Sequence, residues 1–141
     1  MLDVLAIRRD LGDDNDVATV LNSLGLLAHE RKDYVAAEKY FREALEFSQQ
    51  SADKEVQALP ISGLGALALD CKQWAEARQW YEQELALAKE IGQVSLIASA
   101  NYGLACVWEA ESRPGMNVGA KFLLCFSISR ITLTIEVVEI E

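Results

Sequence analysis

A single histidine, His29, is the first candidate for acid–base chemistry in this sequence, because an imidazole changes its charge near neutral pH. Glu30 and Asp33 follow closely and are the kind of carboxylate that can orient a catalytic histidine. Catalysis of this kind also needs a nucleophile beside the base, and no Ser or Cys stands one helical turn from His29. We therefore predict a surface or groove-lining histidine, no catalytic residues, and a protein that is not an enzyme.

The cysteines and the acidic turn at 13–16 are the candidates for metal binding. A structural zinc site needs about four close-set ligands, but Cys71, Cys106 and Cys125 form no Cys-x-x-Cys pair and the chain has one His. The acidic turn lacks the rest of a calcium-loop pattern, so we expect it to cap the helix that follows. A Gly-rich phosphate loop is also missing. We expect no metal, no cofactor, and idle thiols in a reducing compartment.

The charge balance argues against a nucleic-acid partner, since proteins that bind nucleic acids gather Lys and Arg on one face. The 141 residues include 13 Lys and Arg against 22 Asp and Glu, which gives a net charge of −9. The N-terminus shows no secretory signal, and no stretch reaches the ~20 apolar residues of a membrane-spanning helix. The sequence therefore predicts a cytoplasmic protein that binds neither nucleic acid nor a membrane.

An internal repeat of about 40 residues sets the elements that would position any site. Large and small apolar residues recur at this offset, and chance does not produce so many matches of size and type. The matched sets are Leu5, Leu45 and Leu85; Ala18, Ala58 and Ala98; Leu24, Leu64 and Leu104; Gly25 and Gly65; Tyr34 and Trp74; Ala37 and Ala77; and Phe41 and Tyr81.

Within each unit the apolar residues recur at three- and four-residue steps, which is the period of an amphipathic helix. Two such runs are separated by a polar break, at 31–33 in the first unit and at 70–73 in the second. Each unit is therefore expected to be an antiparallel helical hairpin, with a helix A followed by a helix B. One hairpin cannot bury its apolar stripe on both sides, so we predict an all-α solenoid of stacked hairpins.

A ladder of small and aromatic residues runs through both units: Gly25, Tyr34, Ala37, Phe41 and Ala44, then Gly65, Trp74, Ala77 and Tyr81. This ladder resembles the tetratricopeptide repeat, and the resemblance implies a right-handed α-solenoid that binds proteins. The chain departs from the family pattern at Glu84, where a small residue is usual, and at Gln49, near which a Pro usually closes helix B. Its unit of about 40 residues, against the usual 34, is similar to the long repeats of kinesin light chains and of bacterial signalling proteins.

The resemblance covers residues 1–112 and divides them into repeat units. The predicted units are a partial one (1–11), two full ones (16–50 and 56–91) and a second partial one (94–111). Pro114 and Gly115 then stand where the next helix B should begin. The pattern therefore starts and stops within a unit, as expected of a fragment of a longer array.

Pro60 bears on where helix A of the second full unit begins. Pro is tolerated in the first turn of a helix, whereas further in it removes a hydrogen bond and clashes with the preceding turn. We predict a late start near Leu59, with a kinked helix as the alternative.

The last segment, 113–141, abandons the repeat and is predicted to form a separate, β-like tail. Ile131, Leu133, Ile135 and Val137 alternate with polar residues, which is the period of a strand. Three interpretations are open. The tail is a non-native extension, or a strand that pairs with a second copy to give a homo-oligomer, or a cap over the last helix.

By the resemblance, helix A lines a concave face that binds an extended or helical peptide. Register carries twelve residues to this face: Thr19, Asn22, Leu26, His29, Leu59, Ser62, Ala66, Leu69, Ser99, Tyr102, Cys106 and Glu109. Family members that hold the C-terminal carboxylate of a chaperone use Lys and Asn at several of these positions; here Asn22 is the one match and no Lys or Arg is among the twelve. We expect a partner held by side-chain packing more than by charge.

Three functions are compatible with this sequence. The first is a scaffold or adaptor module that binds a protein or peptide partner through the concave helix A face. The second is a regulatory or sensor segment of a larger multidomain signalling or transcription-regulatory protein, which a flanking DNA-binding or ATPase domain would favour. The third is an architectural module that self-associates.

Overall fold

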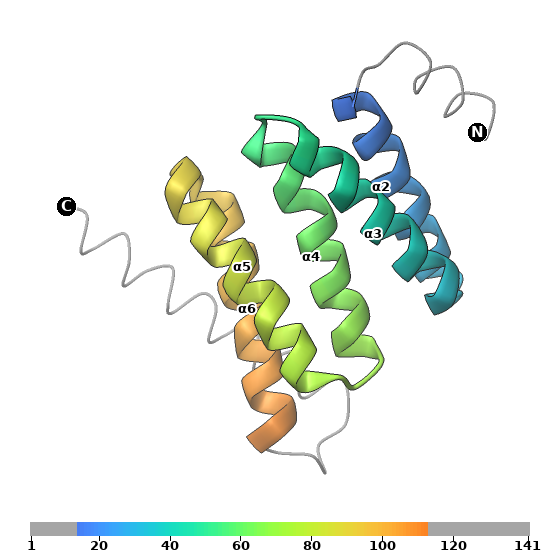
Figure 1. The fold of residues 1–141 in the computed structure, drawn as a ribbon. Coiled ribbons are helices and arrows are strands. Elements are labelled where there is room, and N and C mark those ends of the chain that lie inside the picture. The colour runs from blue at the N-terminus through green and yellow to red at the C-terminus, as the bar shows by residue number, and fades with distance from the viewer. Residues whose placement is uncertain (1–13, 113–141) are drawn as a thin grey trace.

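The computed structural model describes residues 14–112, which form α-helices joined by short turns (Figure 1). The helices are α2 (Asp14–Glu30), α3 (Tyr34–Gln50), α4 (Lys54–Asp70), α5 (Trp74–Ile91) and α6 (Val94–Ser112). No strand occurs within 14–112, and the predicted all-α class is confirmed. The predicted partial unit at 1–11 and the predicted β-like tail at 113–141 lie outside the described residues.

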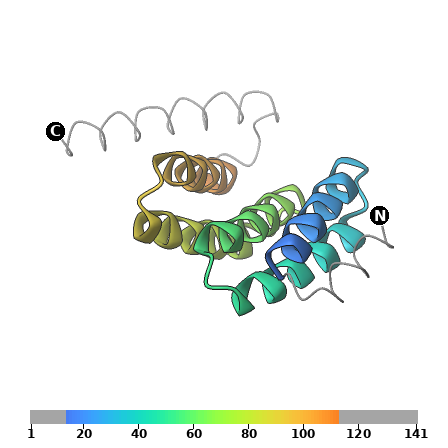
Figure 2. The ribbon, with the colours of Figure 1, turned by 90° about the horizontal axis from the view of Figure 1, so that it is seen from above.

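Consecutive helices pack against each other in the manner of a solenoid. The α2–α3 and α4–α5 pairs are antiparallel hairpins, and α6 follows as the helix A after them. Contacts also join α2 to α4 and α4 to α6, so the three helices A lie side by side, while α3 and α5 form a second layer (Figure 2). This arrangement gives α2, α4 and α6 one common outer side, which we call the helix A face.

The turn inside each hairpin uses the same backbone conformation. Lys32 and Lys72, one repeat apart, both adopt a left-handed φ of 61°. Asp33 then starts α3 by accepting a hydrogen bond from Ala36 N at 3.2 Å, whereas Gln73 at the matching place before α5 makes no such side-chain cap. The turn geometry thus repeats even where the capping residue does not.

Phe41 fills the contact between the first hairpin and the second, and it is fully buried. Its ring lies directly against Gly25 of its own hairpin and Gly63 of the next. A Cβ placed on Gly25 would stand 2.6 Å from the ring, and one on Gly63 would stand 2.5 Å from it. Both positions therefore require the absence of a side chain, which accounts for two glycines inside helices despite their poor helix propensity.

Tyr81 fills the second contact in the same way. A Cβ on Gly65 would lie 3.0 Å from its ring, and one on Gly103 of α6 would lie 2.2 Å from it. Each aromatic ring is thus held between a glycine of its own hairpin and a glycine of the following helix A. We refer to these two contacts as the first junction (around Phe41) and the second junction (around Tyr81).

The predicted late start of the second helix A is wrong. α4 begins at Lys54, and Pro60 lies inside it, fully buried. The reason is the cap before the helix: the Asp53 side chain accepts hydrogen bonds from Glu55 N at 3.0 Å and Val56 N at 3.4 Å. That cap, together with the burial of the Pro60 ring, offsets the backbone hydrogen bond that Pro cannot donate.

Candidate interaction site

Three of the twelve residues predicted for the helix A face are exposed to solvent: Thr19, Leu26 and Leu59. Leu26 on α2 is 47% exposed and Leu59 on α4 is 40% exposed, which is high for large apolar side chains. The half-buried members are His29, Ser62, Ala66, Leu69, Ser99, Tyr102 and Cys106, and the buried ones are Asn22 and Glu109. The set therefore mixes an accessible, partly apolar surface with residues that lie deeper between the helices.

His29 joins the first hairpin to the second through its side chain. Its Nε2 lies 2.6 Å from Asp70 Oδ2 at the end of α4, and its ring lies 5.9 Å from that of Tyr34, measured between centroids. Both contacts are structural, because they hold the ends of α2, α3 and α4 together. The position of the imidazole is thus explained by its part in joining the two hairpins.

The helix A layer carries very little positive charge. α6 contains no Lys or Arg, and α4 contains only Lys54, which pairs with Glu90 of α5. Gln93, just before α6, binds Glu55 of α4 at 2.6 Å. The polar side chains at this end of the helix A layer are therefore paired with each other.

Glu84 of α5 is the most unusual residue beneath the helix A face. Its side chain is fully buried, and the polar groups that interact with its carboxylate are the hydroxyls of Ser99 and Ser62, neither of which makes a hydrogen bond of good geometry. Burial raises the pKa of Glu84 from 4.5 to about 7, while the nearby hydroxyls of Ser99 on α6 and Ser62 on α4 act in the opposite direction. A carboxylate at the meeting point of α4, α5 and α6 thus faces two helix A residues and no cation.

Tyr81 lies one helical turn before Glu84 on α5, and its ring is buried. Burial raises the pKa of its phenol well above the ordinary value of 10, and the charge of Glu84 adds to the effect. The phenol therefore stays neutral at all physiological pH values. Its role in the second junction is packing against the glycines.

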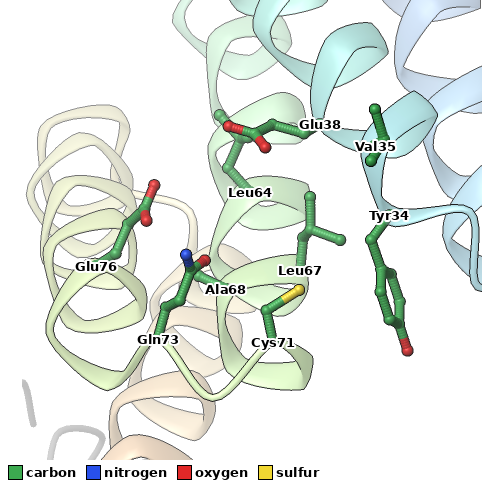
Figure 3. A pocket seen from close by; sticks show the side chains of 9 residues that line it. All are labelled: Tyr34, Val35, Glu38, Leu64, Leu67, Ala68, Cys71, Gln73 and Glu76. Atoms are coloured by element: carbon green, nitrogen blue, oxygen red, sulfur yellow. The ribbon is translucent and has the colours of Figure 1, made fainter.

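A concave feature lies away from the helix A face, between α3, α4 and the start of α5 (Figure 3). It is a cavity of about 200 Å³, smaller than a typical small-molecule site. Its lining residues are Tyr34, Val35, Glu38, Leu64, Leu67, Ala68, Cys71, Gln73 and Glu76.

The rim of this cavity is acidic and internally paired. Arg42 donates to Glu38 at 2.8 Å and to Glu76 at 3.4 Å, and its guanidinium lies 5.9 Å from the centre of the Trp80 ring. Burial, followed by the negative charges of Asp70, Glu38 and Glu76, raises the pKa of the Cys71 thiol. Cys71 is exposed, and this shift favours its thiol over the more reactive thiolate.

Sequence reasoning missed Gly63, Gly103 and this cavity. The two glycines are themselves one repeat apart, so the repeat contained a signal for them. The cavity left no such signal, because it forms from residues of three helices that only the fold brings together. Within residues 14–112 there is no group of three or more His, Cys, Asp or Glu side chains placed to hold a metal ion.

The comparison with known families decides what kind of repeat this is. The tetratricopeptide repeat family matches residues 2–50. This stretch carries a tetratricopeptide repeat. The small and aromatic ladder of that repeat returns one unit later, in α4 and α5. No match to a curated protein or to a solved structure is found.

Tetratricopeptide repeats generally mediate interactions between proteins, and they are typically non-catalytic. Protein partners are therefore what the repeat indicates for this chain. No helix among the described residues has the length and apolar character needed to cross a membrane.

Proposed function

We propose that this protein is a scaffold or adaptor module that binds a segment of a partner protein across the helix A face of α2, α4 and α6. The observation that carries the proposal is the exposure of Leu26 and Leu59 on two neighbouring helices of that face. Apolar side chains exposed on one face are typical of interaction surfaces. The twelve residues predicted for partner binding all belong to these three helices.

A non-enzymatic role in the cytoplasm is part of the same proposal. His29 is engaged in a structural contact with Asp70. The free, exposed thiol of Cys71 suits a reducing compartment, where it does not oxidise to a disulfide.

The test is the capture of partner proteins by the full chain and by variants of it. The variants place a charge either on the helix A face or on α3. Leu26→Glu and Leu59→Glu alter the helix A face, whereas Val35→Glu alters a residue of α3 that is 83% exposed. We expect both leucine variants to lose the captured partner and Val35→Glu to retain it, with all three melting close to the unaltered chain. Loss in Val35→Glu alone would contradict the proposal and assign binding to the cavity beside α3.

A further inference from the structure

Glu84 has no structural purpose that its surroundings explain. A buried carboxylate with no cation and no hydrogen bond of good geometry is costly to keep ionised, and native proteins rarely retain one without a reason. The matching residue of the first junction is Ala44, which is also fully buried and packs with Val17 and Leu21. A small apolar residue at this position is therefore enough for the fold, and packing does not require the carboxylate of Glu84.

The surroundings of Glu84 connect it to the helix A face. The hydroxyls beside its carboxyl group belong to Ser62 of α4 and Ser99 of α6, on two different helices A. Both serines are half-buried, and their hydroxyls lie beside the carboxylate. Ser62 and Ser99 are also two of the twelve residues predicted for partner binding, so they link Glu84 to the helix A face.

The cation that such a carboxylate needs is missing from the helices that surround it. The only basic residue of α4 and α6 is Lys54, which is already paired with Glu90. On α5, Arg78 is paired with Glu111, and Lys89 in the last turn is exposed to solvent. The chain as a whole carries a net charge of −9, which attracts a positively charged partner.

The number of acceptors fits one kind of cation best. A lysine ammonium is compact and donates three hydrogen bonds, and the carboxylate of Glu84 with the hydroxyls of Ser62 and Ser99 offers three acceptor groups. An arginine guanidinium is larger and planar, with five donors in a fixed fork. The three groups around Glu84 therefore suit an ammonium better than a guanidinium.

We propose that the second junction is a binding site for a lysine side chain, supplied by the partner that occupies the helix A face. This inference rests on the proposed function, because the lysine must arrive on a segment bound to that face. Its ammonium enters between Ser62 and Ser99 and pairs with the carboxylate of Glu84. The partner segment is thus basic at one position and packs through side chains elsewhere.

The experiment is the selection of random displayed peptides on the full chain at pH 8, where Glu84 is ionised. Parallel selections use the unaltered chain, Glu84→Gln, and Glu46→Gln as the matched control, since Glu46 is an exposed residue of α3. We expect a lysine at one position in peptides from the unaltered chain and from the control, and its loss with Glu84→Gln. Glu84→Ala, which introduces the residue of the first junction, repeats the test if the glutamine variant folds poorly.

A selected peptide then allows a pairwise measurement. Replacing its lysine by norleucine should weaken binding to the unaltered chain about tenfold, as expected for a hydrogen-bonded charge pair, and leave binding to Glu84→Gln unchanged. Peptides that are lost with Leu26→Glu but show no lysine preference would overturn this inference and leave the proposed function standing. An arginine preference would overturn the lysine assignment. Peptides insensitive to Leu26→Glu and Leu59→Glu, or no peptides at all, would overturn both proposals.

Discussion

The two junctions of this molecule share one packing arrangement but differ in polarity. In the first, Phe41 lies between two glycines and Ala44 completes an apolar cluster with Val17 and Leu21. In the second, Tyr81 lies between two glycines in the same way, but Glu84 replaces the alanine and faces serines.

The difference shows which positions the repeat requires and which it leaves free. An aromatic ring between glycines is required in both junctions, because that contact joins one hairpin to the next. The position one turn later accepts either a methyl group or a carboxylate, at very different cost. A binding function can be added at a position that the fold does not require. The lysine site proposed at Glu84 stands at such a position.

The largest expected effect comes from making the first junction resemble the second. Ala44→Glu places a larger, charged side chain in a fully buried apolar cluster, where Asn22 and Leu59 stand in place of the two serines. We expect a loss of about 4 kcal/mol in the free energy of unfolding at pH 8, from overpacking and from the unpaired charge. Urea unfolding followed by circular dichroism measures it. Ala44→Met, which adds size without charge, should lose less, and an equal loss would mean that charge has no part in the effect.

The second effect is a pH dependence specific to the second junction. Burial gives Glu84 a pKa of about 7 in the folded chain, against 4.5 when unfolded, so the folded state holds the proton more tightly. The resulting stability is fully present below pH 4.5 and is lost as the pH rises to about 7. The shift corresponds to about 3 kcal/mol.

Unfolding measured from pH 4 to pH 8 on the unaltered chain and on Glu84→Gln isolates this contribution, since the other carboxylates are common to both. The unaltered chain should lose about 3 kcal/mol more than Glu84→Gln over that range. Parallel curves for the two proteins would show that Glu84 titrates normally.

The third effect compares the glycines that hold the rings. Gly63→Ala would bring a Cβ to 2.5 Å from the Phe41 ring, whereas Gly65→Ala would bring one to 3.0 Å from the Tyr81 ring. We expect Gly63→Ala to lose about 2 kcal/mol, because a buried ring cannot move aside easily. The better helix propensity of Ala should largely offset the milder contact at Gly65. Thermal melts rank the two variants, and the opposite order would disprove this account of the junctions.

The smallest effect concerns the outer layer, where Arg42 links α3 to α5 through Glu76. Both side chains are partly exposed, so Arg42→Ala should cost about 0.5 kcal/mol at low salt. The difference should shrink at about 1 M salt, where exposed charges are screened. Lys39→Ala, an exposed change on the same helix, serves as the control. A loss that is equally large at high salt would indicate that packing against Trp80, and not charge, gives Arg42 its effect.

Much of the fold could be predicted from the sequence because residues of matching size recur one repeat apart. Gly25 and Phe41 have counterparts of matching size one repeat later, in Gly65 and Tyr81, and the helical period follows from the apolar spacing. Pro60 misled the prediction because the intrinsic cost of Pro was weighed without the cap at Asp53, which fixes an earlier helix start at Lys54. Propensity alone could not show that the cap prevails.

The site was less predictable. Register places Ser62 and Ser99 on helices A, but it does not show that both hydroxyls lie beside Glu84. The spacing Ala77, Tyr81, Glu84 and Ala88 puts the glutamate on the buried stripe of α5. The general tendency of charged residues to stay at the surface argues against that placement. Only the packed structure shows that Glu84 is buried with this stripe and that its carboxylate faces two hydroxyls and no cation.

The way each ring is held has a consequence for how such an array can change over generations. Phe41 and Tyr81 each depend on a glycine of their own hairpin and on one of the next helix A. A duplication or deletion that begins and ends at the same register leaves every ring between two glycines. One of any other length would set a ring against a side chain. Inheritance can therefore lengthen or shorten this protein in whole repeats, while residues such as Glu84 vary independently within each copy.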